Sequence, residues 1–291
     1  MSNYKIVTET TCDFPSGYYE EHDIATLHLS CIMDGETYGK GREIPLDLFY
    51  KKLREGSMPT TSQVNPDQAK ELFMEISKEY KEILYIGFSS GLSGSCQSAI
   101  IAANEIMEEH PDIKIHLVDS LCASMGQGLF VHKAVQMRDE GKSAKEVADY
   151  LEAHKQNLVH LVAVDDLFHL YRGGRVSRTS AVVGSMIGIK PIIHVNEEGK
   201  LIPIDKVRGR KKSLLTLVDM MEKQMGSYRD KNKDEYIFIS HSDCVEDAEF
   251  LKEEIQKRFG YDKFMISYIG AVIGSHTGPG TAVIFFWGDE R

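Results

Sequence analysis

The first half of the chain alternates short apolar runs with segments of helical periodicity. The apolar runs predict strands at residues 4–8, 83–88 and 113–118. The intervening and following segments predict helices after Pro66, across residues 99–106 and from about Ala123. Alternation of this kind predicts a parallel sheet, and ligand sites in such sheets lie at the carboxyl ends of the strands.

Two predicted helices in this half also have a recognisable start. Asn65 suits an N-cap position and Pro66 the first turn that follows it. Further along, Ser143 and Glu146 have the spacing of a capping box, which predicts a helix to about Lys155.

The second half of the chain departs from strict alternation. A strand at residues 160–164 and a short helix over 165–171 precede two runs that pair as a hairpin, 192–195 with 201–207, through the turn 197–200. Helices at 211–225 and 246–259 and strands at 236–240, 264–269 and 282–287 complete a second α/β unit. We therefore expect two α/β domains, residues 1–157 with a parallel sheet and residues 158–291 with a mixed sheet.

Two glycine-rich segments are candidates for a binding site. Residues 269–281 read IGAVIGSHTGPGT, and we interpret them as a loop that presents His276 and Thr277. Residues 87–95 read GFSSGLSGS and follow a predicted strand, so their hydroxyls suit a carboxylate, phosphate or acyl group. Two such segments predict one small-molecule pocket.

Composition narrows the function classes. The chain has 291 residues, a net charge of −10 and a pI near 5.6, which disfavours nonspecific binding to nucleic acid. Five cysteines without a CxxC pair argue against a disulfide framework or a zinc cluster, and we expect a cytoplasmic protein. No apolar run approaches the roughly 18 residues of a membrane span, so a transmembrane segment is not expected.

Two basic clusters stand out, at residues 172–178 and 206–212. Each fits either a solvated face or a binding site.

The serines allow two chemical interpretations. The sequence GFSSG has the G-x-S-x-G pattern of a nucleophile elbow, which would make Ser89 or Ser93 the nucleophile of a hydrolase with His276 and either Asp119 or Asp243. In the other interpretation, Thr61, Ser62 and Ser93 donate hydrogen bonds to an anion without attacking it. No Walker A, HExxH or complete dinucleotide motif is present, so ATP binding by this chain alone is not expected.

Several motifs together make the chain resemble DegV-type proteins, the fatty-acid-binding subunits of bacterial fatty acid kinase. They are KIVTETTCD at 5–13, PTTSQ at 59–63, GLSGSCQSA at 91–99, VDS at 118–120 with ASMGQGL at 123–129, GGRVS at 173–177, KPII at 190–193, KVRGRKK at 206–212, SHSDC at 240–244 and GSHTGPGT at 274–281. Two departures stand out. The family's TDS is Thr8-Glu9-Thr10, and Cys96 occupies a position where an aromatic is common, which is expected to influence the acyl chain that fits.

The resemblance implies a two-domain α/β protein that holds a long-chain fatty acid between its domains. It implies that Thr61, Ser62, Ser93, His276 and Thr277 surround the carboxylate, with Arg208 as the cation. It further implies a non-catalytic subunit without a metal or cofactor of its own. Its partners would be an ATP- and magnesium-binding kinase subunit and an acyl phosphate acyltransferase. Arg172, Arg175 and Arg178 would contact the kinase or the phosphate. A lipid sensor without a kinase partner remains an alternative.

Overall fold

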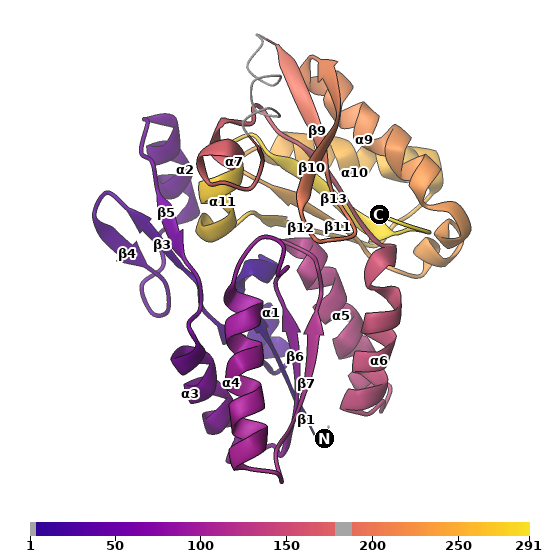
Figure 1. Ribbon diagram of the computed structural model, residues 1–291. Coiled ribbons are helices and arrows are strands. Elements are labelled where there is room, and N and C mark those ends of the chain that lie inside the picture. The colour runs from indigo at the N-terminus through magenta and orange to yellow at the C-terminus, as the bar shows by residue number, and fades with distance from the viewer. Residues whose placement is uncertain (1–3, 178–187) are drawn as a thin grey trace.

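The computed structural model describes residues 4–177 and 188–291 and shows two α/β domains stacked end to end (Figure 1). The first domain is built on a four-stranded sheet, the second on a six-stranded sheet, and a small three-stranded sheet lies beside them.

The sheet of the first domain is parallel throughout. Its order is β2-β1-β6-β7, from strands β1 (Tyr4–Glu9), β2 (Ile24–Leu27), β6 (Glu82–Gly87) and β7 (Lys114–Asp119). Because side chains alternate along a strand, its two faces pack against different helices. One face packs against α3 (Pro66–Ser77) and α4 (Ser95–Glu109), and the other against α5 (Met125–Asp139) and α6 (Ala144–His154). The predicted parallel sheet is confirmed.

The sheet of the second domain is mixed, in the order β10-β9-β8-β13-β11-β12. Its strands are β8 (Leu158–Ala163), β9 (Ile189–Val195), β10 (Leu201–Arg208), β11 (Ile237–His241), β12 (Phe264–Tyr268) and β13 (Ala282–Trp287). Only β11 and β12 pair in parallel. The predicted hairpin is present as β9–β10, and it lies at one edge of the sheet. Helices α9 (Arg210–Gln224) and α10 (Val245–Phe259) cover the outer face of this sheet.

The small sheet was not predicted. Strands β3 (Ser30–Met33), β4 (Glu36–Tyr38) and β5 (Thr60–Ser62) pair antiparallel in the order β4-β3-β5, and α2 (Leu46–Arg54) packs on them. These strands are three or four residues long, which leaves little periodicity to detect. The sheet matters for function because β5 carries Thr61.

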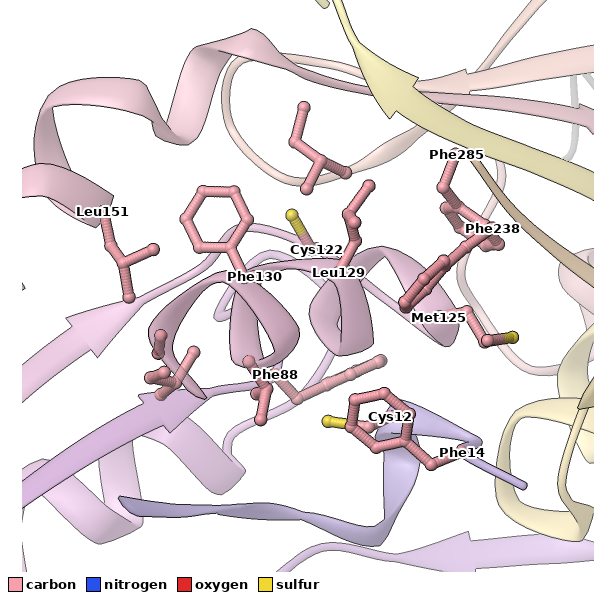
Figure 2. Close-up of a cluster of buried hydrophobic side chains, with 14 of the residues drawn as sticks. Cys12, Phe14, Phe88, Cys122, Met125, Leu129, Phe130, Leu151, Phe238 and Phe285 are labelled. Carbon is pink, nitrogen blue, oxygen red and sulfur yellow. The ribbon is translucent and has the colours of Figure 1, made fainter. Parts of the chain in front are cut away.

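Helix α5 lies between the two main sheets and is buried on nearly every side. Its residues Met125, Leu129 and Phe130 belong to one buried cluster with Phe88 and Phe238, which Figure 2 shows. Two glycines in its first turn permit the close packing. A Cβ on Gly126 would lie 2.1 Å from Nε2 of His160, and one on Gly128 would lie 3.1 Å from the carbonyl oxygen of Cys12. The two domains therefore share one packed core.

The remaining helices of residues 4–177 and 188–291 are short. They are η1 (Thr10–Cys12), α1 (Tyr18–Glu21), η2 (Lys155–Asn157), α7 (Phe168–Arg172), η3 (Gly226–Tyr228), η4 (Lys231–Lys233) and α11 (Ala271–Thr277). The predicted N-cap at Asn65 and the predicted capping box at Ser143 are both present, and Asn65 forms a capping box with Gln68 as well.

The prediction of a loop over residues 269–281 was wrong, because α11 forms there. Gly270 is its N-cap, and Gly278, at φ +73°, ends it. Inside the helix, a Cβ on Gly274 would lie 2.7 Å from the hydroxyl of Tyr50, so this glycine permits close packing on α2 rather than a bend in the chain. His276 and Thr277 are therefore at the rigid end of a helix.

Candidate functional site

A cavity of about 320 Å³ lies between α7, α11, the Ser/Gly segment after β6 and the inner face of the mixed sheet. Its volume is within the range of small-molecule sites, about 300–1,000 Å³. Most of its wall is apolar: Leu29, Phe88, Leu92, Ala123, Val162, Leu170, Ile193, Val195, Leu201, Ile269, Val272, Ile273, Val283 and Phe285. Its polar lining residues are Thr61, Ser62, Gln63, Ser93, Ser124, His160, Arg175, His276 and Thr277.

Thr61 and His276 contact each other in the cavity wall although 215 positions separate them in the sequence. Oγ1 of Thr61 lies 2.8 Å from Nε2 of His276. Strand β5 supplies the threonine, and the last turn of α11 supplies the histidine. The structure thus brings together two of the predicted head-group residues.

The imidazole of His276 is held uncharged by its surroundings. Burial, and then the positive charges of Arg175 and Arg172, lower its pKa to about 4. Its other ring nitrogen, Nδ1, makes no hydrogen bond and lies against Gly173, where a Cβ would be 2.1 Å from that atom. A neutral imidazole in this position can donate or accept one hydrogen bond at Nε2.

Arg175 is the arginine in the cavity wall. Its Nε and Nη2 donate to the carbonyl oxygen of Leu92, at 3.2 and 3.0 Å, and its Nη1 donates to Gly173. Burial lowers the pKa of Arg175, but a guanidinium remains charged at neutral pH. Because Leu92 precedes Ser93, this arginine also fixes the Ser/Gly segment beside its own charge.

Ser93 lines the same cavity. Its Oγ accepts from the amide of Ser95 at 3.2 Å and lies 3.1 Å from the hydroxyl of that residue, at the start of α4. When the hydroxyl of Ser95 donates to Oγ of Ser93, the hydroxyl proton of Ser93 is free to donate to a ligand in the cavity.

Arg172 connects two segments of the site through hydrogen bonds. It donates through Nη1 to the carbonyl oxygen of Pro59 at 2.8 Å and through Nη2 to that of Ser275 at 3.0 Å. Pro59 precedes β5, and Ser275 is in α11. One guanidinium therefore joins the two segments that carry Thr61 and His276.

The other predicted residues fall into three groups. Ser62 and Thr277 line the cavity, and Ser62 is exposed at its edge. Arg208 is not in the cavity wall: it is exposed at the end of β10, paired with Ile189, so the structure places Arg175 rather than Arg208 as the cation of the cavity. Arg178 lies outside the described residues.

The apolar wall was not predicted residue by residue. Three neighbouring strands supply much of it through alternate positions: Val162 from β8, Ile193 and Val195 from β9, and Val283 and Phe285 from β13. The alternating positions can be found in the sequence, but it does not show which strands are neighbours. Cys96 does not line the cavity; its thiol packs under Gly87.

The hydrolase geometry is not formed. Ser89 is fully buried, and its hydroxyl donates to the carbonyl oxygen of Gly199 at 2.7 Å. His276 bonds Thr61 and not a serine. Over residues 4–177 and 188–291, no three His, Cys, Asp or Glu side chains gather as metal ligands, and no helix there is both long and apolar enough to span a bilayer.

Comparisons with known proteins show which proteins share this fold. A DegV domain-containing protein of Clostridium perfringens is 44% identical over 293 residues, covering 100% of this chain and 99% of its own. A crystal structure of DegV from Bacillus subtilis, described as a fatty acid binding protein, has a TM-score of 0.84 and 30% identity over 99% of this chain and 100% of its own. A DegV family protein from Thermus thermophilus, described by its fatty acid binding, has a TM-score of 0.87 and 28% identity, over 99% of this chain and 100% of its own. The profile of the DegV family matches residues 3–288, and the chain belongs to that family.

Proposed function

We propose that this protein binds one long-chain fatty acid, with the tail along the apolar wall and the carboxylate at Thr61, Ser93, Arg175 and His276. The observation that carries the proposal is the joining of a largely apolar cavity of about 320 Å³ to one cluster of hydroxyls, imidazole and guanidinium. The fatty acids bound by the similar proteins of Bacillus subtilis and Thermus thermophilus support it.

The tail and the head group contribute differently to binding. Each buried methylene contributes about 0.8 kcal/mol, so roughly 15 of them contribute on the order of 10 kcal/mol before ordering costs. A buried carboxylate must be paired or hydrogen-bonded, because an uncompensated buried charge is very costly. The tail therefore supplies affinity, and the polar cluster supplies orientation and selectivity for an acid.

We further propose that the bound acid is presented to a separate kinase subunit, which supplies ATP and magnesium and converts the carboxylate to an acyl phosphate. An acyltransferase would then consume the acyl phosphate. The family resemblance supports this step, as does a polar cluster of donors that suits a developing phosphate charge. Arg172 and Arg178 are candidates for contact with the kinase, and the protein would act in the cytoplasm.

Native mass spectrometry of the protein as expressed tests lipid binding, because a tightly held fatty acid should copurify. A lipid-free protein that also fails to bind added palmitic acid would contradict the proposal. The mass of the extracted lipid identifies its chain length.

A second experiment tests presentation. Ser93→Ala or His276→Ala should lower acyl phosphate formation with a fatty acid kinase subunit more than it lowers lipid retention, while the surface variant Thr216→Ala should change neither. Equal losses would contradict the separation of head and tail.

Two outcomes would favour the alternative functions. A lipid-loaded wild-type protein that supports no acyl phosphate formation would favour a lipid sensor. Stoichiometric labelling by a fluorophosphonate would favour a hydrolase.

A further inference from the structure

Asp13 is a buried carboxylate outside the cavity wall that joins the first domain to the second. Its Oδ1 accepts from the amide of Gly270 at 3.0 Å, and its Oδ2 accepts from the hydroxyl of Ser124 at 2.6 Å. Asp13 follows β1 and η1 in the first domain, whereas Gly270 follows β12 in the second. Neither donor carries a charge, so the carboxylate's role here is to hold two backbone segments in place.

The first of these segments begins α11. Gly270 is the N-cap of that helix and has no side chain to cap it, so the side chain of Asp13 supplies a hydrogen-bond acceptor for an amide at the helix start. The glycine is needed for the approach, because a Cβ on residue 270 would lie 2.7 Å from Oδ1 of Asp13. His276 lies six residues further on, about 9 Å along the helix axis at 1.5 Å per residue.

Helix α11 is fixed near both ends. Beside Gly270, the hydroxyl of Tyr50 donates to the carbonyl oxygen of Ile269 at 2.6 Å, and at the far end Arg172 donates to Ser275. Because α11 is only seven residues long and its backbone hydrogen bonds join its two turns, we expect it to move as one body. Displacement of its start would therefore be transmitted to His276 and to the contact of this residue with Thr61.

The second segment begins α5. Ser124 lines the cavity and precedes α5, and its Oγ lies 3.0 Å from that of Ser240 in β11. Asp13 itself cannot shift easily, since its neighbours Cys12 and Phe14 are packed in the core cluster that Figure 2 shows. It is thus a fixed point from which two cavity-lining segments are positioned.

We propose that Asp13 is a positioning residue for the head-group site: its carboxylate sets α11, and with it His276, relative to Thr61. The inference rests on the proposed function for its effect on acid binding. Its structural part, the placement of His276, does not require a ligand.

The placement of His276 is tested in lipid-free full-length protein by NMR titration of the imidazole. In Asp13→Ala, the start of α11 loses its acceptor and His276 becomes more solvated. Its pKa should therefore rise from about 4 toward the ordinary value of 6.5. Asp13→Asn keeps an acceptor for Gly270 and should retain most of the depression. A His276 pKa unchanged in Asp13→Ala would overturn the proposal.

The effect on recognition is tested by comparing palmitic acid with 1-hexadecanol, which has the same tail and no carboxylate. Asp13→Ala should weaken binding of the acid by about tenfold, equivalent to about 1.4 kcal/mol, and binding of the alcohol by much less. Asp13→Asn should restore most of the preference for the acid. Equal weakening of both ligands would mean that Asp13 only stabilises the fold, contrary to the proposal.

Val147→Ala controls for destabilisation, because Val147 is fully buried in α6 and does not line the cavity. It should lower the melting temperature without changing the ratio of the two affinities. Failure of the wild-type protein to bind palmitic acid would overturn the proposed function, whereas the His276 titration would still decide the role of Asp13.

Discussion

His276 is the residue whose charge state reports most directly on the site. The buried imidazole, beside two arginines, has a pKa lowered to about 4 and is neutral at pH 7. A carboxylate bound next to it favours the imidazolium form and offsets the arginine charges. We therefore expect palmitic acid to raise the pKa of His276, measured by NMR titration with and without the lipid.

His132 is a matched control for that titration. Burial lowers its pKa to about 4 as well, but it bonds Tyr18 and does not line the cavity. Its pKa should not change when lipid is added. An unchanged His276 in a protein with lipid bound would show that the carboxylate lies elsewhere.

Arg175, which lines the cavity, and Arg208, which the family resemblance assigned to the carboxylate, can be separated by substitution. Arg175→Lys retains a positive charge but loses the paired donation to Leu92, so acid affinity should fall by about tenfold. Arg208→Ala removes an exposed side chain at the end of β10 and should leave affinity within about twofold. Equilibrium binding of palmitic acid distinguishes them, and the reverse order would reassign the cation.

At the scale of elements, the site depends on how closely α7 approaches α11. Gly173 follows α7, and Gly173→Ala would place a Cβ 2.1 Å from Nδ1 of His276. The ring must then move away from Thr61, so we expect weaker binding of the acid and lower acyl phosphate yield. Isothermal titration with palmitic acid measures the first effect.

The neighbouring glycine provides the control. Gly174 has φ +74° with open space around its Cβ position, so Gly174→Ala strains the backbone without contacting His276. It should cost about 1 kcal/mol of stability and leave acid affinity nearly unchanged. Similar affinity losses in both variants would indicate that the segment after α7 acts through its backbone, not through the histidine.

The elements also show how far the sequence alone determines the site. Capping signals and apolar periodicity predicted α3 and α6 and the strands of both main sheets except β2, because these are local properties. They failed at α11, where glycine is unfavourable in a helix but is required for packing against Tyr50. Thr61, Ser93 and His276 were predicted through motif resemblance, whereas the choice of Arg175 over Arg208 depended on strand order and could not be made locally.

At the scale of the whole molecule, buried carboxyl groups of the first domain support the cavity, and one of them, Asp13, also bonds Gly270 of the second domain. Glu9 lies beneath the Ser/Gly segment and accepts from the amide of Phe88 at 2.9 Å, from Gln127 at 2.6 Å and from the hydroxyl of Tyr85. On the other side, Gly91 approaches the β9–β10 turn so closely that a Cβ would lie 2.4 Å from the carbonyl oxygen of Glu198. Glu9, at the end of β1, and Asp13, directly after η1, thus bond two residues that line the cavity, Phe88 and Ser124.

These carboxylates predict an unusual dependence of stability on pH. Burial raises the pKa of Glu9 and of Asp13 to about 7, and their hydrogen-bond donors oppose that shift only in part. The folded protein therefore retains these protons between about pH 4 and 7, where the unfolded chain has released them. Each group contributes stability that is present below its unfolded pKa and is lost as pH rises to about 7.

Comparison of Glu9→Gln with the wild type isolates this contribution, because the buried histidines, whose lowered pKa values act in the opposite direction, are common to both proteins. Between pH 4 and 7 the free energy of unfolding of the wild type should fall relative to that of the variant, by on the order of 3 kcal/mol. Urea unfolding at several pH values measures the difference. A constant difference across that range would mean that folding does not raise the pKa of Glu9, and that its three donors balance the effect of its burial.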